Sequence, residues 1–418
     1  MTGTRKTTMR LSVHYCFIQG DFWMSSSVII GFAAAYLQSK QIDNTQIGII
    51  LALAYILSII LQQMMAAAAD KHKRLPLKIM TAGLMAAVVS LSILLAGCTD
   101  SEKLIAVLFI LVCTLHLSIV PLINSLALQF VDRGIPVNFS VARGMGSVFY
   151  GIISFIVGYL VQRDGAAVIV PVFAVIYGIL LVLTLTFPSP SPQMGKSEEG
   201  IGGRSQKIKG ESFIAFFVRY KLFFVLLAGV TLQFITFNAT CTYMINILRA
   251  VGGDSADLGL SNGLGALSEL PTFLLFNYLV RKIRCSTLLK IAAFFFVVKF
   301  IVLLLATGVA MILFAQGLQM VTFALFIPAS VYYVNERMDS ENKVKGQALM
   351  TAAYIGVSGT IGDFAGGQMI DRLGVQAMLQ AGVVLSILGL ALIVIGAKDT
   401  ADLRVSKALK AEGSCCHE

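Results

Sequence analysis

Long apolar stretches separated by short polar segments run through almost the whole chain. Twelve of them reach or exceed the roughly 20 residues that an α-helix needs to cross a bilayer. This pattern excludes a soluble two-domain protein of the same length. We therefore predict an all-α membrane protein with twelve transmembrane helices, over residues 11–37, 45–69, 77–97, 103–130, 138–163, 166–187, 220–249, 257–281, 286–307, 309–334, 343–372 and 375–397.

The composition agrees with a chain whose solvent is mostly lipid. Of its 418 residues, 57% are hydrophobic and 13% are charged, whereas soluble proteins carry about 25% charged residues. The net charge of +10 is compatible with nucleic-acid binding, but the basic residues lie in short segments between the apolar stretches. That placement is typical of cytoplasmic membrane loops, so we expect a lipid bilayer and no nucleic acid as partner.

The distribution of basic residues predicts the orientation. With both termini inside, 25 of the 32 Lys and Arg residues fall in inside segments and five in outside loops. The remaining two, Arg143 and Lys299, lie within spans. Because cytoplasmic loops are enriched in Lys and Arg, we predict a multi-pass protein of the cell (inner or plasma) membrane with both termini in the cytoplasm.

An internal repeat divides the chain into two halves. A basic segment follows the second span at Asp70–Lys78 and the eighth span at Arg281–Lys290, and a Gly-rich span end recurs at Gly158–Gly165 and Gly367–Gly374, in each case about 210 residues later. Duplicated six-helix halves are a transporter architecture. We predict two pseudo-symmetric six-helix bundles, over residues 1–187 and 220–398. A cytoplasmic linker, 188–219, joins them, and a cytoplasmic tail, 399–418, follows the second bundle.

Four local stretches carry a resemblance to a known family: Asn138–Tyr150, Ser268–Leu270, Phe294–Phe300 and Gln316–Phe326. With them, the chain resembles the major facilitator superfamily, in the branch that holds lactose permease, phenylpropionate-permease-like proteins and nucleoside symporters. The likeness covers about residues 10–398. It implies the major facilitator fold, a monomer, secondary active transport and no cofactor, with the proton gradient as the energy source.

Arg143 and Tyr150 are candidate substrate ligands. The resemblance places Arg143 on an arginine that binds substrate hydroxyls, and Tyr150 near an aromatic residue that stacks on the sugar ring. The planar guanidinium offers paired hydrogen bonds to hydroxyls or to a carboxylate. The alternative is an arginine that extends to the membrane interface from the start of its span.

Glu269 is a carboxylate in an apolar span, where a charge costs about 2.5–3.5 kcal/mol. The resemblance implies a role in substrate binding and proton coupling; the alternative is a neutral, hydrogen-bonded packing residue. Lys299 falls where the permease carries an arginine, and we expect it to bind substrate and to pair with Glu269.

The sequence differs from lactose permease at several positions where the permease has functional residues. The family commonly has a histidine at Gln319, and the permease has its main proton-carrying glutamate at Thr322. Its span-4 carboxylate falls near Asn124 or Ser125. Since none of these side chains titrates near neutral pH, the lactose mechanism does not carry over, and we expect Gln319 and Asn124 to contact substrate as neutral groups.

Two further carboxylates lie in spans. Asp21 is a candidate proton carrier or partner for Arg143, and Asp363, in a Gly-rich stretch suited to close helix packing, is a second candidate proton carrier. Alternatively, both are hydrogen-bonded packing residues or line a water-filled cavity. Asp70 and Arg74 resemble the superfamily's gating signature between spans 2 and 3, and we expect them to act in gating. The alternative is a simple basic cytoplasmic cluster.

Enzyme chemistry lacks a sequence basis. The chain has four histidines, which are far apart, and it has neither a G-x-S-x-G nor a P-loop motif. Cys415, Cys416 and His417 are too few ligands for a metal site. The predicted function is proton-coupled symport, an uptake of a small polar solute such as a sugar, nucleoside or aromatic carboxylate by alternating access. The alternative is proton-coupled efflux of sugars or drugs by antiport.

Overall fold

The computed structural model describes residues 2–71, 76–98, 101–131, 135, 137, 139–188, 213–339 and 342–398. All regular structure within these residues is helical. This follows from the apolar composition, because a chain in lipid must satisfy its backbone hydrogen bonds internally and a helix does so within one segment.

The helices of the N-terminal half match the first six predicted spans closely. The first span is divided between two helices, and the sixth begins with one 3₁₀ turn. The elements are α1 (Thr2–Ile29), α2 (Ala33–Ser39), α3 (Asn44–Lys71), α4 (Leu77–Gly97), α5 (Glu102–Val131), α6 (Phe139–Asp164), η1 (Ala166–Val168) and α7 (Ile169–Thr186).

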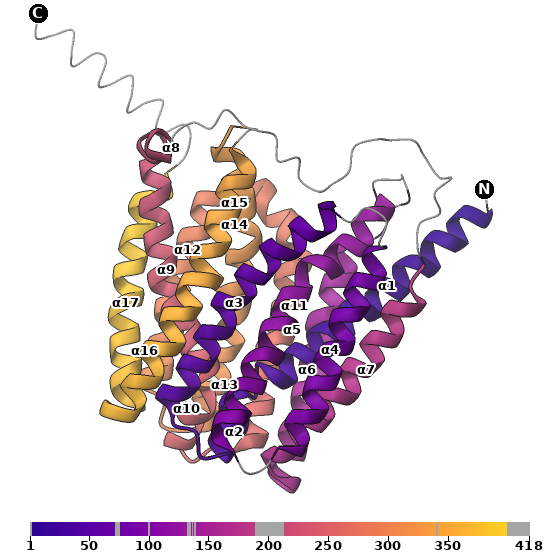
Figure 1. Cartoon of the computed structure of the whole chain (residues 1–418). Coiled ribbons are helices and arrows are strands. Elements are labelled where there is room, and N and C mark those ends of the chain that lie inside the picture. The colour runs from indigo at the N-terminus through magenta and orange to yellow at the C-terminus, as the bar shows by residue number, and fades with distance from the viewer. Residues whose placement is uncertain are drawn as a thin grey trace, which may run out of the picture.

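The C-terminal half repeats this arrangement with more interruptions. Its elements are α8 (Phe213–Arg219), α9 (Lys221–Thr242), α10 (Met244–Ala250), α11 (Ser255–Lys282), α12 (Cys285–Leu304), α13 (Val309–Gly317), η2 (Leu318–Met320), α14 (Phe323–Arg337), α15 (Lys343–Thr351), η3 (Ala352–Val357), α16 (Ser358–Leu373) and α17 (Val375–Gly396). Figure 1 shows the two halves beside each other, with α3 and α11 near their boundary.

Ten helices within the described residues are long and apolar enough to cross a membrane. The two other predicted spans are also helical: residues 11–37 form most of α1 and α2, and residues 343–372 form α15, η3 and α16. The predicted helical membrane architecture is confirmed.

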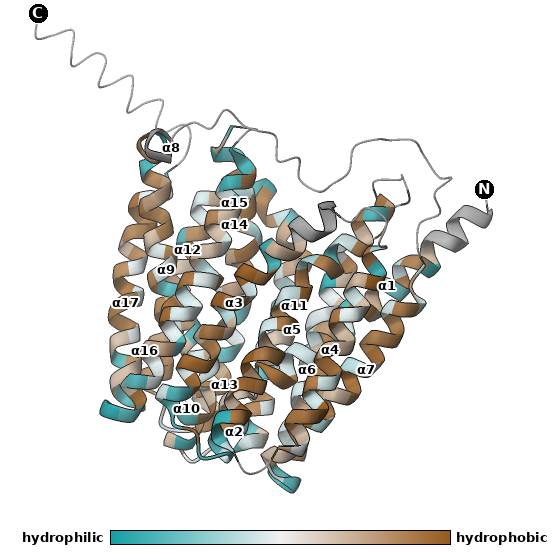
Figure 2. Ribbon diagram, in the orientation of Figure 1, coloured by the Kyte–Doolittle hydropathy of each residue, from teal (hydrophilic) through white to brown (hydrophobic). Residues whose placement is uncertain are grey.

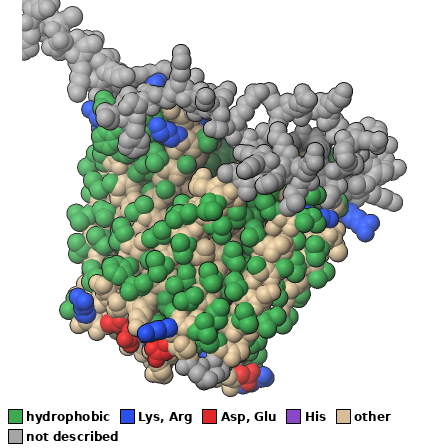
Figure 3. Space-filling model, viewed as in Figure 1, with side chains coloured by type: hydrophobic (Ala, Val, Ile, Leu, Met, Phe, Trp, Pro, Cys, Tyr) green, Lys and Arg blue, Asp and Glu red, His purple; other side chains and the backbone are tan. Residues whose placement is uncertain are grey.

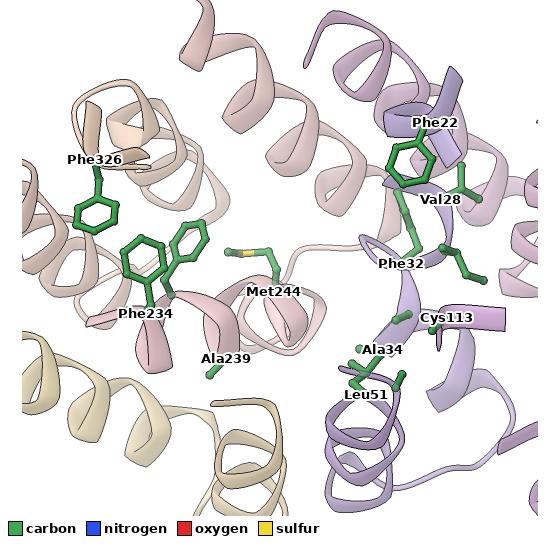
Figure 4. Packing of buried hydrophobic residues seen from close by; sticks show 14 of the residues in the cluster. Phe22, Val28, Phe32, Ala34, Leu51, Cys113, Phe234, Ala239, Met244 and Phe326 are labelled. Carbon is green, nitrogen blue, oxygen red and sulfur yellow. The ribbon is translucent and has the colours of Figure 1, made fainter. Parts of the chain in front are cut away.

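Hydrophobic side chains lie in two environments, the outer flank of the bundle and its interior. Apolar residues cover the flank of the bundle, while charged side chains gather at its two ends (Figures 2 and 3). Other apolar residues are buried inside the bundle, among them Phe22 and Phe32 in one half and Phe234 and Phe326 in the other (Figure 4). The buried residues of both halves belong to one hydrophobic core.

The halves meet along two helix pairs, α6 with α11 and α3 with α16. Glycines allow the backbones to approach closely: a Cβ added at Gly158 would lie 2.7 Å from the Cα of Gly259, and one added at Gly263 would lie 3.0 Å from the carbonyl oxygen of Gly151. Such small-residue contacts are how membrane helices pack tightly. Gly158 and Gly259 lie toward the end of the bundle opposite to the N-terminus, which we call the distal end.

A set of polar residues joins the halves at the distal end. Gln38 of α2 donates to Asn246 of α10 at 2.7 Å and accepts from Arg249 at 2.7 Å. Asp371 of α16 accepts from the side chain of Asn44 at 2.7 Å. We call this set the distal latch; its members are Gln38, Asn44, Thr45, Asn246, Arg249 and Asp371. The latch and the contact between Gly158 and Gly259 join the two halves at this end of the bundle.

Candidate functional site

Glu269 lies between the two halves. It comes from α11 and is 7% exposed. Gln319 donates its amide to one carboxylate oxygen at 3.3 Å, and Ser147 of α6 donates its hydroxyl to the other at 3.5 Å. Both distances are long for hydrogen bonds. The carboxylate is thus held loosely by one group from each half.

Lys299 is buried on α12 and is connected to Glu269 through an amide. Its ammonium donates to Gln316 at 2.9 Å and to the Gln319 oxygen at 2.5 Å. Gln319 then donates to Glu269 from its nitrogen. The expected Glu269–Lys299 pair is therefore not a direct ion pair here, because Gln319 stands between the two charges and hydrogen-bonds to both.

Arg143 occupies the facing side of α6. Its guanidinium lies 4.0 Å from the centroid of the Trp23 ring on α1, within the range of a cation–π contact. Glu269 and Tyr354 lie close enough to act on it electrostatically. Arg143, Ser147 and Tyr150 are spaced four and three residues apart, so one face of α6 carries all three.

Tyr150 and Asn124 lie farther from the carboxylate. A Cβ added at Gly31, where the first span breaks, would be 3.1 Å from the Tyr150 hydroxyl. Asn124 accepts from Gln19 at 3.0 Å, and Gln19 accepts from the Trp23 indole at 3.1 Å. Asn124 is therefore linked to Arg143 through Gln19 and Trp23 and not by contact.

Asp21 does not lie against Arg143. It is 4% exposed on α1, and one of its oxygens has no hydrogen-bond partner. Its electrostatic neighbour is Tyr177 of α7, within the N-terminal half. The hypothesis that Asp21 supplies the partner of Arg143 does not fit this geometry, because the guanidinium rests on Trp23.

Asp363 is fully buried where α16 packs on α3 and α9. Thr242 donates to one carboxyl oxygen at 2.8 Å, and the other oxygen has no partner. Tyr243 donates to the Asp363 backbone carbonyl and also lies 2.9 Å from the Asn44 carbonyl of α3. Asp363 is thus placed next to the distal latch and not beside Glu269.

Several residues at the site were not predicted from the sequence. Trp23, Ser147, Gln316 and Tyr354 are neutral and resemble ordinary packing residues in an apolar stretch. Ser147 was detectable from its spacing to Arg143. Tyr354 lies in η3, a π-helical turn, and such turns are often found at functional sites.

Some predictions lie outside the described residues. The side chain of Asp70 and the whole of Arg74, the two gating candidates, are outside them, as are Cys415, Cys416 and His417. Within the described ranges, no group of three His, Cys, Asp or Glu residues is arranged to hold a metal ion.

Comparison with known proteins places the chain among transporters. A family model described as "MFS_1 like family" matches residues 8–381. The chain is 25% identical to a maltose permease of Geobacillus stearothermophilus, covering 87% of this chain and 89% of the permease. It is 27% identical to a probable 3-phenylpropionic acid transporter of Escherichia coli, covering 61% and 65% of the two chains. Its fold is similar to a crystal structure of a variant of the nucleoside transporter NupG, with a TM-score of 0.75, 14% identity and coverage of 93% and 98%.

Proposed function

The chain belongs to the MFS_1-like family and is a membrane transporter of the major facilitator type, and we propose that it is a proton-coupled symporter for uptake of a small polar organic solute. Family membership also means that it is not an enzyme and needs no cofactor. In the proposed cycle the proton gradient supplies the energy, and the halves expose a central site to each side of the membrane in turn.

The observation that carries this proposal is the position of Glu269. Its buried carboxylate is contacted by Ser147 from one half and Gln319 from the other, through long hydrogen bonds. A proton on Glu269 removes its charge and turns one oxygen into a donor. Protonation would then alter the contact between the halves, which is what coupling proton movement to a change of access requires.

The remaining site residues have proposed roles in binding. Arg143, through its fork of donors, and Gln319 would contact polar groups of the solute. Lys299 would do so once its amide partners move. Tyr150 would line the solute's path near the break of the first span, and Asn124 would hold Gln19 and so Trp23 in place.

Alternating access requires each end of the site to open and close. The distal latch would close the outer face if the termini are cytoplasmic. It would be complemented by Asp70 and Arg74, which would contribute to closure of the inner face.

Asp363, which lies next to the latch, and Asp21 would each bind a proton in addition to the one on Glu269. Both side chains have a buried oxygen without a hydrogen-bond partner among the described residues. Burying such an oxygen costs less free energy when the side chain is a neutral acid than when it is a charged carboxylate.

Proteoliposomes with an imposed pH gradient test the proposal. We expect the wild-type protein to accumulate its solute above the external concentration, and the Glu269→Gln variant to exchange solute without accumulating it. Glu102→Gln is the matched control, because Glu102 is exposed at the start of α5. Accumulation by Glu269→Gln at the wild-type level would exclude Glu269 as the coupling residue.

The direction of transport needs a separate measurement. Symport predicts that cells expressing the protein accumulate solute, and that an uncoupler abolishes the accumulation. Antiport, the alternative, predicts that the uncoupler raises the cellular content instead.

A further inference from the structure

Arg143 is a cation on the second turn of α6, close enough to Glu269 for the two charges to interact. Its guanidinium has five donors, but its contact in the structure is the face of Trp23 at 4.0 Å. No hydrogen bond or ion pair of this guanidinium is found among the described residues. A charged group held at membrane depth normally pairs with another charge or with a ligand.

The side-chain charges of Arg143, Lys299 and Glu269 do not sum to zero. Among the described residues, Glu269 is the one carboxylate that acts on both Arg143 and Lys299, so the three groups carry one excess positive charge while it is ionised. Lys299 is held by the neutral amide oxygens of Gln316 and Gln319. When Glu269 takes a proton, the excess rises to two, and an anion is then strongly favoured next to the guanidinium.

Aromatic rings adjoin this positive site. Trp23 lies under Arg143, and Tyr354 from the other half is close enough to interact with it. Phe237 lies 5.6 Å from the Lys299 ammonium and stacks on Phe323 with ring centroids 5.3 Å apart. Rings of this kind offer an apolar surface for a flat or hydrophobic body beside the charged fork.

We propose that the transported solute is an organic monoanion, in which a carboxylate binds the fork of Arg143 and an aromatic or otherwise apolar body packs on the neighbouring rings. This inference rests on the proposed function, since the proton on Glu269 accompanies the anion. One monoanion and one proton then cross together with no net charge. A neutral sugar or nucleoside carried with one proton would instead move one positive charge.

Binding of a carboxylate to the site can be measured by the fluorescence of Trp23. Trp23 is the single tryptophan of the sequence, so its fluorescence reports events at Arg143. The probes are 3-phenylpropionate and its neutral analogue 3-phenylpropanamide, titrated into the purified full-length protein. We expect the carboxylate to bind about tenfold or more tightly than the amide, the size of effect that a charge-assisted hydrogen-bond pair provides.

The variants separate charge from shape. Arg143→Gln should remove the preference for the carboxylate, and Arg143→Lys should retain part of it because the charge remains without the fork. Arg372→Gln, at an exposed position on α16, should bind as wild type. Thermal stabilisation by each probe is the second readout, because substitution of Arg143 itself changes the surroundings of Trp23.

Transport distinguishes failure of this inference from failure of the proposed function. In proteoliposomes with a pH gradient, 3-phenylpropionate should accumulate at a rate that a potassium diffusion potential does not change. If maltose or uridine accumulates instead, faster with the interior negative, and the carboxylate neither binds nor moves, proton coupling stands and the anion inference is wrong. If no probe responds to the pH gradient, both are wrong.

Discussion

The carboxylate of Asp371, near the end of α16, accepts hydrogen bonds from both the backbone nitrogen and the hydroxyl of Thr45, at the start of α3, at 2.6 and 2.7 Å. An acidic side chain at a helix N-terminus satisfies free backbone donors and favours the helix dipole. Here the acid comes from the opposite half of the molecule, so this cap of α3 is also a contact between the two halves.

Asp371→Asn should therefore open the distal end more often. Loss of the charge removes about 1–2 kcal/mol from these hydrogen bonds, which corresponds to roughly a five- to thirtyfold change in an equilibrium. Cys241 is a natural reporter, because its exposed thiol lies near Lys299, Glu269 and Asp363. We expect faster labelling of Cys241 by a membrane-impermeant maleimide added at the distal face of oriented vesicles.

Two controls accompany this measurement. Asp164→Asn changes an acid at the same end of the bundle that pairs with Arg163 of its own helix, and it should not change labelling. Cys241→Ser should lower the signal to the level contributed by the other accessible thiol of the distal end, Cys98 at the end of α4. Unchanged labelling in Asp371→Asn would mean that the latch does not determine access.

Gly158→Ala tests the closeness of α6 and α11. The new Cβ would lie 2.7 Å from the Gly259 Cα, and a backbone atom cannot move aside as a side chain can. Overpacking of this kind costs about 1–3 kcal/mol, and it acts on the state in which the distal end is closed. We expect increased Cys241 labelling from the distal face and reduced transport.

Gly178→Ala is the matched control for the glycine contact. Gly178 lies on α7 with open space where its Cβ would be, so the same substitution should be neutral or stabilise the helix by up to about 1 kcal/mol. Equal effects of the two substitutions would show that helix propensity, and not the contact between halves, is responsible.

The positions of the helices were largely predictable from hydropathy. The predicted spans 77–97 and 375–397 correspond to α4, which is Leu77–Gly97, and α17, which is Val375–Gly396. Lipid leaves a long apolar stretch few choices besides a helix. The break of the first span near Gly31 and the π-helical turn η3 were not predicted, because they depend on contacts with other helices.

The site was predictable where a charge stands out against an apolar background. Glu269, Lys299 and Arg143 were found that way, but the partners of each charge were not. Hydropathy does not give the rotation of a helix, so Asp21 was considered as a partner of Arg143 although its electrostatic neighbour is Tyr177 of α7. Gln316 and Trp23 were overlooked because a neutral or aromatic residue in a span has no distinguishing signal.

The connection from Lys299 to Glu269 through Gln319 predicts a relayed coupling. We expect the effects of Glu269→Gln and Lys299→Met on thermal unfolding of the purified protein to be non-additive by about 1 kcal/mol, as for residues in one hydrogen-bond network. In a Gln319→Leu background the coupling should fall, because the amide that contacts both charges is gone. A coupling of undiminished size in that background would indicate a direct ion pair instead.

Asp363→Asn tests whether this buried acid carries a proton that transport uses. The substitution preserves the shape of the side chain and an oxygen for the 2.8 Å hydrogen bond from Thr242, so the variant should fold and exchange solute across the membrane. It removes the ability to gain and lose a proton, so accumulation driven by a pH gradient should fall. Asp43→Asn, at an exposed position before α3, is the control. Wild-type accumulation by Asp363→Asn would assign Asp363 to helix packing alone, and loss of both exchange and accumulation in a folded variant would assign it to the movement of the latch.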